Sequence, residues 1–260
     1  MRNRKNTYVF ASALAGAYLF LGGGGFLIAK GEEKTSHPRE KLGGYTTYFN
    51  EKEGGRCENI RLAAARLDGI ALQPYGELSF NGAVGPRTEQ NGYKKAKVIV
   101  QGEFVEGVGG GVCQVSTTLY NAALLSGLEV LEYHPHSLRV WYVPLSRDAM
   151  VTAWCDLRLF NPKSETVYLS LTVGEGYLRV CFLGKADGKT YSIESKELEE
   201  IPPPEPTVEL GDSDAVLKEG RSGVKSESYL KTYQNGVLVG VKRLRTDEYA
   251  PQRGVIRKKV

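Results

Sequence analysis

The sequence predicts an α+β domain with a largely antiparallel sheet and a cysteine-bearing helix packed on it. A small all-β C-terminal module and an N-terminal transmembrane helix complete this expected fold. Two segments place apolar residues at helical spacing, and short alternating segments with glycine-containing turns separate and follow them. A proline-rich, acidic stretch then divides this pattern from the last part of the chain. With 260 residues, 41% of them hydrophobic, the chain can bury a core of ordinary size.

The first thirty residues predict a membrane anchor. Three basic residues among the first five precede an uncharged run from Thr7 to Ala29, which is long enough to cross a hydrocarbon core of about 30 Å as a helix. The basic cluster stays in the cytoplasm by the positive-inside rule. We therefore expect residues 1–30 to be a cytoplasmic tip and transmembrane anchor (or a signal) and residues 31–44 to be a polar stalk. The bulk of this single-pass protein of the cell membrane would then be extracytoplasmic.

The main domain is expected over residues 45–185. A first helix is predicted at "CENIRLAAARLDG", where four apolar residues share one stripe and Gly69 supplies a C-cap. A second helix is predicted to start at Cys113 and to be closed by Gly127. The predicted strands are "GELSFNGAVG", "AKVIVQGEFVEG", "LEVLEY", "SLRVWYVP", "VTAWCDLRLFNP" and "TVYLSLTV".

The C-terminal part is predicted to be a linker followed by a small β module. Residues 186–215 carry an acidic run and three consecutive prolines, which is typical of an interdomain linker. Residues 216–260 alternate in polarity around a Gln-Asn-Gly turn, which predicts a hairpin.

Charge and motifs favour neither nucleic acid nor a cofactor as a partner. The net charge is +4, but three basic residues lie among the first five and three more among the last four, so the body is close to neutral. The run "GVGGG" lacks the Lys-Ser/Thr of a phosphate-binding loop. His134 and His136 could bind a metal with Cys113, but no firm carboxylate ligand accompanies them. We expect no cofactor, no metal and no nucleic acid.

The four cysteines leave several readings open. In an exported chain they would ordinarily suggest two disulfides. Cys155 and Cys181 both lie in strand-like segments, so they could be neighbours or buried free thiols. If Cys113 is a working thiol, one of the other three is unpaired, and a merely packed Cys113 is the alternative.

Cys113 has the surroundings of a nucleophile. It follows three glycines and opens a helix, whose N-terminal N–H groups favour a thiolate and could bind an oxyanion. His134 and His136 are two residues apart in a predicted strand, so both imidazoles can face one way and supply a base. Asp156, Asp148 and Glu132 could each orient the imidazole, and we take Asp156 as the third member.

The residues of this region resemble the VanW family over about residues 45–175. The resemblance rests on "TTYFN", "NIRLAAARLDG", "DLRLFN" and the long stretch from "GELSFNGAVGPRTEQNGY" to "EYHPHSLRVWYVPLSRDAMV", with "GGGVCQVSTTLYNA" as its most characteristic string. The tail from about residue 220 to 260 is similar to a truncated G5 module. The sequence departs from the family pattern at Tyr133 and Met150, and Cys57 and Cys155 are additions to it.

The resemblance implies a role in the bacterial cell envelope. The family takes its name from glycopeptide-resistance (vancomycin-resistance) clusters, and some members are reported to be L,D-transpeptidases that cross-link peptidoglycan through the family cysteine. The expected function is therefore an L,D-transpeptidase acting on peptidoglycan stem peptides through a thioester at Cys113. His136 would be the base, with His134 as its neighbour or orienting group. The expected oxyanion or substrate contacts are Gly110, Gly111, Val112 and Gln114.

Two other functions fit the same residues. A non-catalytic envelope-binding module would use the glycine loop to recognise a stem peptide or glycan. A cysteine peptidase or amidase would act on the same stems, with water in place of an amine as the acyl acceptor.

Overall fold

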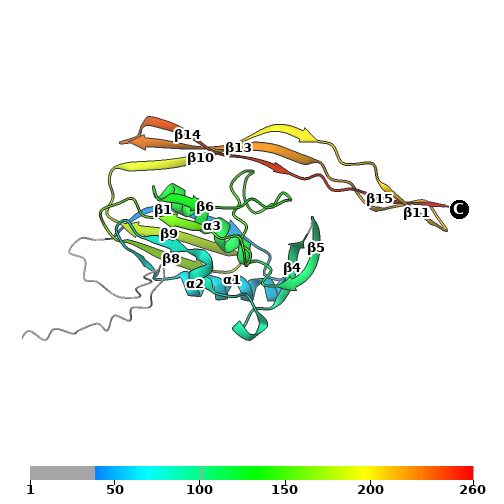
Figure 1. Ribbon diagram of the computed structural model, residues 1–260, viewed down its shortest axis with the longest axis horizontal. Helices are drawn as coiled ribbons and strands as arrows, with labels where there is room; N and C mark the ends of the chain where they lie inside the picture. Colours follow the sequence, from blue (N-terminus) through cyan, green and yellow to red (C-terminus); the bar gives the residue numbers. More distant parts are fainter. Residues whose placement is uncertain (1–38, 101, 260) are drawn as a thin grey trace, which may run out of the picture.

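The computed structural model describes residues 39–100 and 102–259, which form two parts. Residues 39–185 make a compact half, and residues 189–259 make a long C-terminal arm that lies across it (Figure 1). Within the described ranges, no helix is both long and apolar enough to span a membrane. The predicted anchor and residues 31–38 of the predicted stalk lie outside these ranges.

An antiparallel four-stranded sheet forms the centre of the compact half, in the order β1-β9-β8-β2. Its strands are β1 (Glu40–Tyr48), β9 (Tyr177–Gly184), β8 (Val167–Val173) and β2 (Ala71–Leu72). The end of the expected stalk is therefore part of this sheet. Gly43 lies against the carbonyl of Leu125 and Gly44 lies against Cys181, so neither position has room for a side chain. The Gly-Gly pair marks close packing rather than a flexible connection.

Two helices pack on this sheet and against each other. They are α1 (Gly54–Leu67) and α3 (Val112–Leu125), and the shorter α2 (Phe80–Val84) and a 3-10 turn (Glu89–Asn91) follow α1 in the chain. Both predicted helices are present, and Gly69 and Gly127 behind them adopt positive φ angles of 77° and 71°.

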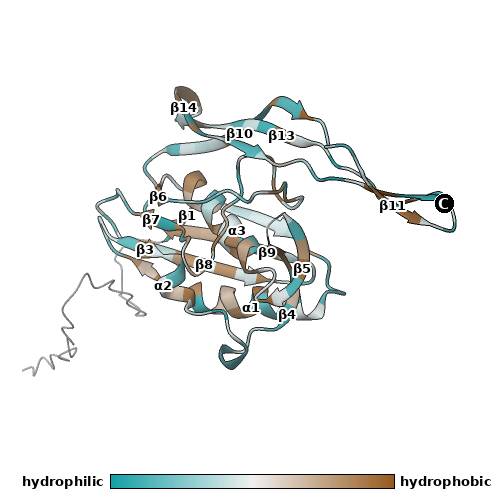
Figure 2. Cartoon of the chain, turned by 45° about the vertical axis from the view of Figure 1, so that its right-hand side comes forward, coloured by the Kyte–Doolittle hydropathy of each residue, from teal (hydrophilic) through white to brown (hydrophobic). Residues whose placement is uncertain are grey.

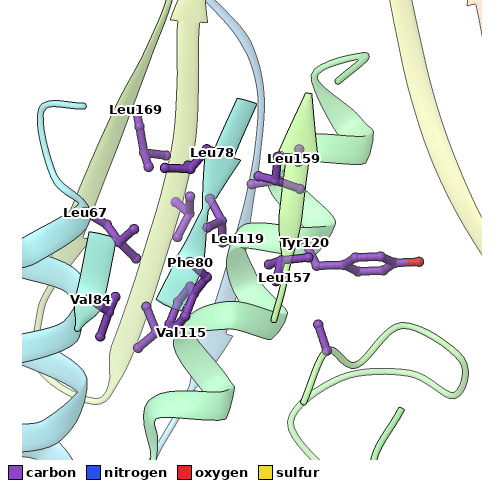
Figure 3. Packing of buried hydrophobic residues seen from close by; sticks show 14 of the residues in the cluster. Leu67, Leu78, Phe80, Val84, Val115, Leu119, Tyr120, Leu157, Leu159 and Leu169 are labelled. Atoms are coloured by element: carbon purple, nitrogen blue, oxygen red, sulfur yellow. The ribbon is translucent and has the colours of Figure 1, made fainter. Parts of the chain in front are cut away.

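The apolar core lies between the helices and the sheets (Figure 3). Leu119 and Val115 of α3 meet Leu67 of α1 there, and all three are fully buried. Burying one such leucine contributes about 1.5–3 kcal/mol. Tyr120 of α3, another member of this cluster in Figure 3, has its ring 5.6 Å from the guanidinium of Arg245 in the arm.

Two smaller sheets complete the compact half. One has the order β3-β7-β6 and the other is the hairpin β4-β5. Their strands are β3 (Glu77–Ser79), β7 (Arg158–Phe160), β6 (Glu129–Glu132), β4 (Lys95–Val100) and β5 (Glu103–Val108).

Residues 133–157, between β6 and β7, form one long loop, so the strand predicted at "SLRVWYVP" was wrong and the one at "VTAWCDLRLFNP" is reduced to β7. The loop backbone pairs with polar side chains of α3 instead of with a strand. Ser116 Oγ donates to the carbonyl of Ala149 (2.6 Å), and Asn121 Nδ2 donates to that of Arg147 (2.7 Å). These bonds satisfy backbone groups that a sheet would otherwise pair.

The arm contains two three-stranded sheets, with the orders β10-β13-β14 and β11-β15-β12. Its strands are β10 (Lys189–Ile201), β11 (Thr207–Gly211), β12 (Ala215–Lys218), β13 (Gly223–Gln234), β14 (Val237–Tyr249) and β15 (Val255–Lys259). The predicted hairpin is confirmed as β13-β14, turning at Asn235 and Gly236, which have φ angles of 50° and 81°.

The predicted linker, residues 186–215, was largely wrong. It contains β10, which pairs along its length with β13, and β11. β10 carries mostly polar and charged residues, and Ile193 is its one side chain that packs against the apolar cluster, so its sequence shows little of the alternation typical of a half-buried strand.

Candidate functional site

Cys113 lies at the second position of α3 and opens into a cleft of about 1040 Å³. The cleft is bordered by the glycine run before α3, the β4-β5 hairpin and the long loop, which contributes His136 and Val151. The thiol donates to the carbonyl of Val151 (3.4 Å) and is hydrogen-bonded to His136. The structure thus places the predicted nucleophile and one predicted base side by side.

His136 is held by a buried carboxylate. Its Nδ1 lies 2.7 Å from Oδ2 of Asp148, and its backbone N–H donates to the same oxygen (2.7 Å). Both side chains are nearly inaccessible, at 6% and 1% exposed. Because Nδ1 is occupied by Asp148, Nε2 is the ring nitrogen left for the thiol. Cys113, His136 and Asp148 therefore lie in one hydrogen-bonded series, which is the order in which a nucleophile, a base and an orienting group would stand.

The arm supplies the other partners of Asp148. Oδ1 accepts from the Tyr249 hydroxyl (2.5 Å) and from Nη2 of Arg245 (3.0 Å), and Nη1 of Arg245 donates to the Asp148 carbonyl (2.6 Å). Nε of Arg245 donates to Asp247 (2.6 Å), so the guanidinium bridges two buried carboxylates. The carboxylate that orients His136 is thus fixed by residues about a hundred positions further along the chain.

The pKa shifts of these groups favour an ion pair. Burial alone would raise the pKa of the Cys113 thiol, but the hydrogen bond and charge of His136, with the charge of Arg87, lower it below its ordinary value. Burial disfavours the imidazolium, yet its bonds to Asp148 and Cys113 raise the pKa of His136 to about 9. Burial is likewise outweighed at Asp148, where His136, Arg245 and Tyr249 lower the pKa to about 2. The pKa shifts of Cys113 and His136 both act in the direction of a thiolate paired with an imidazolium.

The glycines before Cys113 pack against protein on both sides. A side chain at Gly110 would meet the backbone of Lys97 in β4, and one at Gly111 would meet Arg56 in α1. Gly111 also has a φ angle of 102°. We expected Gly110 and Gly111 to contact the substrate or its oxyanion, and the structure shows that their lack of a side chain also lets the start of α3 fit between α1 and β4.

Three N–H groups in this turn remain available for an oxyanion. The N–H of Val112 donates to Gly109 (3.1 Å) and that of Gln114 to Gly111 (3.0 Å). By contrast, the N–H groups of Gly110, Gly111 and Cys113 donate to no acceptor in the described part of the chain. Of the oxyanion contacts expected of Gly110, Gly111, Val112 and Gln114, the backbone therefore leaves those of Gly110 and Gly111 open, together with the N–H of Cys113.

The side chain of Gln114 has a structural role instead. It is fully buried, and its Nε2 donates to Thr47 (3.0 Å) and to the carbonyl of Tyr48 (3.0 Å). Its Oε1 accepts from Arg56 (2.6 Å). Because its amide nitrogen and oxygen are both hydrogen-bonded, the Gln114 side chain connects α3 to β1 and α1 and is not free to bind a substrate.

His134 and Asp156 lie in other networks. His134 pairs with Glu132 (3.0 Å) and is partly exposed, because the loop has left the extended conformation in which both imidazoles would share a face. Asp156 accepts from Ser79 (2.5 Å) and from the N–H of Asn81 (2.8 Å), which fixes the start of α2. The orienting role expected of Asp156 therefore falls to Asp148.

Sequence reasoning missed Arg245 and Tyr249 altogether. A signal for them exists in "RTDEY", where Arg245, Asp247 and Tyr249 alternate along one strand and so share one face. All three are buried, and charged residues are seldom buried on a strand without a partner.

The four cysteines are free thiols in the structure. Cys57, Cys113, Cys155 and Cys181 are all unpaired. Among the described residues, no three His, Cys, Asp or Glu side chains gather as a metal ligand set.

Comparison with known proteins places this domain in a family. The family model described as VanW like protein matches residues 55–183. The Bacillus subtilis protein YoaR is 48% identical over 132 residues, which cover 50% of this chain and 43% of YoaR. The vancomycin B-type resistance protein VanW of Enterococcus faecalis is 25% identical over 150 residues, which cover 55% of this chain and 54% of VanW. The chain thus spans about half the length of the curated relatives it matches.

Two solved structures are similar to part of the chain. The G5 domain of HP0197 is 20% identical with a TM-score of 0.17 and covers 27% of this chain and 96% of that domain. The G5 domain of an IgA1 protease is 22% identical with a TM-score of 0.21 and covers 28% of this chain and 89% of that domain. Because the family model matches residues 55–183, and YoaR and VanW are similar to this chain over about half of its length, the chain belongs to the VanW family.

Proposed function

We propose that this protein is a cell-envelope cysteine acyl-transferase of the L,D-transpeptidase type, acting on peptidoglycan stem peptides. The observation that supports it most is the hydrogen-bonded series of Cys113, His136 and Asp148 at a helix N-terminus inside a large cleft. A packed structural cysteine has no need of a buried imidazole and carboxylate beside it.

The proposed reaction proceeds through a thioester. The Cys113 thiolate attacks the carbonyl that follows the L-centre of the donor stem, and the resulting oxyanion accepts from the N–H groups of Gly111 and Cys113. The protonated His136 then gives its proton to the departing amine of the terminal residue. An amine of a second stem, deprotonated by His136, attacks the thioester, and the thiolate leaves as the new amide forms.

The similarity to known proteins supports the cell-wall part of the proposal. One relative is a vancomycin B-type resistance protein, which points to peptidoglycan as the material on which this chain acts. The uncharged run from Thr7 to Ala29 supports attachment to the membrane with the described part of the chain outside.

Intact-mass spectrometry tests the proposal. The full chain in detergent is incubated with a tetrapeptide stem or with a carbapenem, and an adduct is sought on Cys113. We expect the adduct in the wild type and its loss in Cys113→Ala. Cys155→Ala is the matched control because that thiol is also partly exposed but has no imidazole partner. A folded wild type without an adduct, or an adduct that survives Cys113→Ala, would overturn the proposal.

Product analysis separates the alternatives. With an acceptor stem present, a transferase forms a cross-linked dimer, whereas a peptidase or amidase releases the free acid in equal amount with and without acceptor. A binding module retains the stem without forming either product, and Cys113→Ser leaves that binding intact.

A further inference from the structure

Arg87 is anchored beside the nucleophile by neutral groups. Its stem lies against Gly109, the first glycine of the turn that leads into α3. Its Nη1 donates to Oδ1 of Asn81 (2.7 Å) and to the carbonyl of Gly85 (3.4 Å). Neither acceptor carries a charge, so the guanidinium is positioned without being neutralised.

The anchor of Arg87 is part of the same framework as the thiol. Nδ2 of Asn81 donates to the carbonyls of Thr152 and Cys155, both at 3.0 Å. Thr152 directly follows Val151, whose carbonyl accepts from the Cys113 thiol. Asn81 therefore holds the guanidinium of Arg87 against the same loop segment, residues 151–155, that binds the Cys113 thiol.

The cleft around these residues is cationic. Its lining includes the charged residues Arg56, Arg87, Lys97, Arg139 and Glu53. Glu53 pairs with Arg56 (3.5 Å), and no carboxylate in the described ranges pairs with Arg87. An arginine keeps five N–H donors in a planar fork, so Nε and Nη2 of Arg87 can bind both oxygens of one carboxylate.

We propose that Arg87 forms a carboxylate-binding subsite that takes the free C-terminal carboxylate of the donor peptide. This inference rests on the proposed function. The carboxylate of the terminal residue lies one residue beyond the scissile carbonyl, so a guanidinium beside the nucleophile is suitably placed to hold it. The subsite would select donors that end at the residue to be expelled and would discriminate against longer or amidated ones.

The charge of small alkylating reagents tests the subsite without any peptide. Iodoacetate and iodoacetamide both react by displacement of iodide by the Cys113 thiolate, and only iodoacetate carries a carboxylate. The ratio of their rates at Cys113, measured by peptide mapping of the full chain, reports the local preference for an anion. Arg87 also lowers the pKa of Cys113, so replacing Arg87 slows the reaction of Cys113 with both reagents. Taking the ratio of the two rates cancels this shared effect.

We expect Arg87→Gln to lower the iodoacetate-to-iodoacetamide ratio at Cys113 about tenfold, the loss of one charge-assisted hydrogen-bonded pair. Arg87→Lys should retain part of the ratio. Lys97→Gln removes the same charge from another wall of the cleft and should change the ratio less than about twofold. The ratio at Cys155 in the same digest should not change.

The outcomes for the subsite and for the proposed function are distinguishable. If Cys113 of the wild type reacts with iodoacetamide no faster than an ordinary thiol at pH 6, the nucleophile itself fails. If Cys113 is reactive but Arg87→Gln leaves the ratio unchanged, or Lys97→Gln lowers it equally, the subsite is overturned. With stems, Arg87→Gln should slow a tetrapeptide about tenfold and its C-terminal amide little, and equal slowing of both would also overturn it.

Discussion

The compact half and the arm are held together by different forces. The compact half surrounds a continuous apolar cluster, whereas the arm contributes only Val224 and Tyr249 to the buried hydrophobic residues of the described chain. Figure 2 shows the difference, with hydrophobic colour concentrated in the sheet and α3 and paler or hydrophilic colour along β10 and β13. The buried polar and charged residues of the arm are Ser226, Ser228, Arg245 and Asp247.

These polar residues form a seam against the long loop. Ser228 donates to the carbonyl of Ser146 (2.8 Å), the N–H of Ser146 donates to the Tyr249 hydroxyl (2.9 Å), and Arg245 binds Asp148. Hydrogen bonds are directional, so such a seam fixes position more sharply than apolar contact does. The comparison teaches that the compact half provides stability, while the arm determines where Asp148, and through it His136, is held.

Removing Arg245 should break the seam and have the largest effect. Arg245→Met leaves Asp247 buried without its cation and Asp148 with only His136, and we expect a loss of about 3–5 kcal/mol. Chemical denaturation of the full chain, followed by circular dichroism, measures it. Thiol reactivity should fall too, because Asp148 is released from its position.

The control is Arg243→Met on the same strand. Arg243 is 63% exposed and pairs with Glu227 rather than with Asp148 or Asp247, so a loss of less than about 1 kcal/mol is expected. Equal effects of the two substitutions would mean that the seam does not position Asp148.

Truncating the core tests the other side of the comparison. Leu119 is fully buried, and Leu119→Ala should cost about 2–5 kcal/mol. Leu210 on the arm is 74% exposed, and Leu210→Ala should change the unfolding free energy by less than about 0.5 kcal/mol. Denaturation curves of both variants give the two values. A large loss at Leu210 would show that the arm has an apolar core of its own.

The two histidines sharpen the comparison because only His136 reaches the seam. His136→Gln removes the main influences that lower the pKa of Cys113 and leaves the burial that raises it. Iodoacetamide labelling of Cys113 at pH 6 should therefore slow about 100-fold. In the wild type, reactivity should extend below pH 7 and change again near pH 9, where the imidazolium loses its proton. His134→Gln should keep the wild-type profile, and a shared change would contradict the assignment.

The sequence predicts the elements whose bonds are local. The two long helices and the β13-β14 hairpin follow from spacing and from turn glycines at 69, 127 and 236, which act within a few residues. The long loop could not be predicted, since its backbone is paired by Ser116 and Asn121 of α3, and an alternating pattern does not reveal such partners.

The candidate site shows the same limit. Cys113 and His136 follow from a helix N-terminus and from the scarcity of histidines in the chain. Asp148 and Asp156 are eight residues apart and look alike in sequence. The path of the loop, and the bond from Arg245, which lies 97 residues after Asp148, determine that Asp148 and not Asp156 contacts His136.

Tyr249→Phe should produce the smallest effect and asks which bond of the seam matters. The hydroxyl donates to Asp148 and accepts from the N–H of Ser146, and its loss should cost about 1–3 kcal/mol at pH 7. Tyr229→Phe is the control, because that hydroxyl binds Glu227 and makes no bond to Asp148, and denaturation should show a smaller loss.

The pH dependence of this loss identifies the bond. In the wild type the pKa of Asp148 is lowered to about 2 from its ordinary 3.8. The stability it contributes is therefore complete above pH 3.8 and is lost as the pH falls through about 2. Without the hydroxyl the folded pKa moves up toward 3.8, so the cost of Tyr249→Phe should shrink between about pH 4 and pH 2. A cost that stays constant over this range would assign the effect to Ser146, and the arm would then hold the loop backbone without tuning the carboxylate.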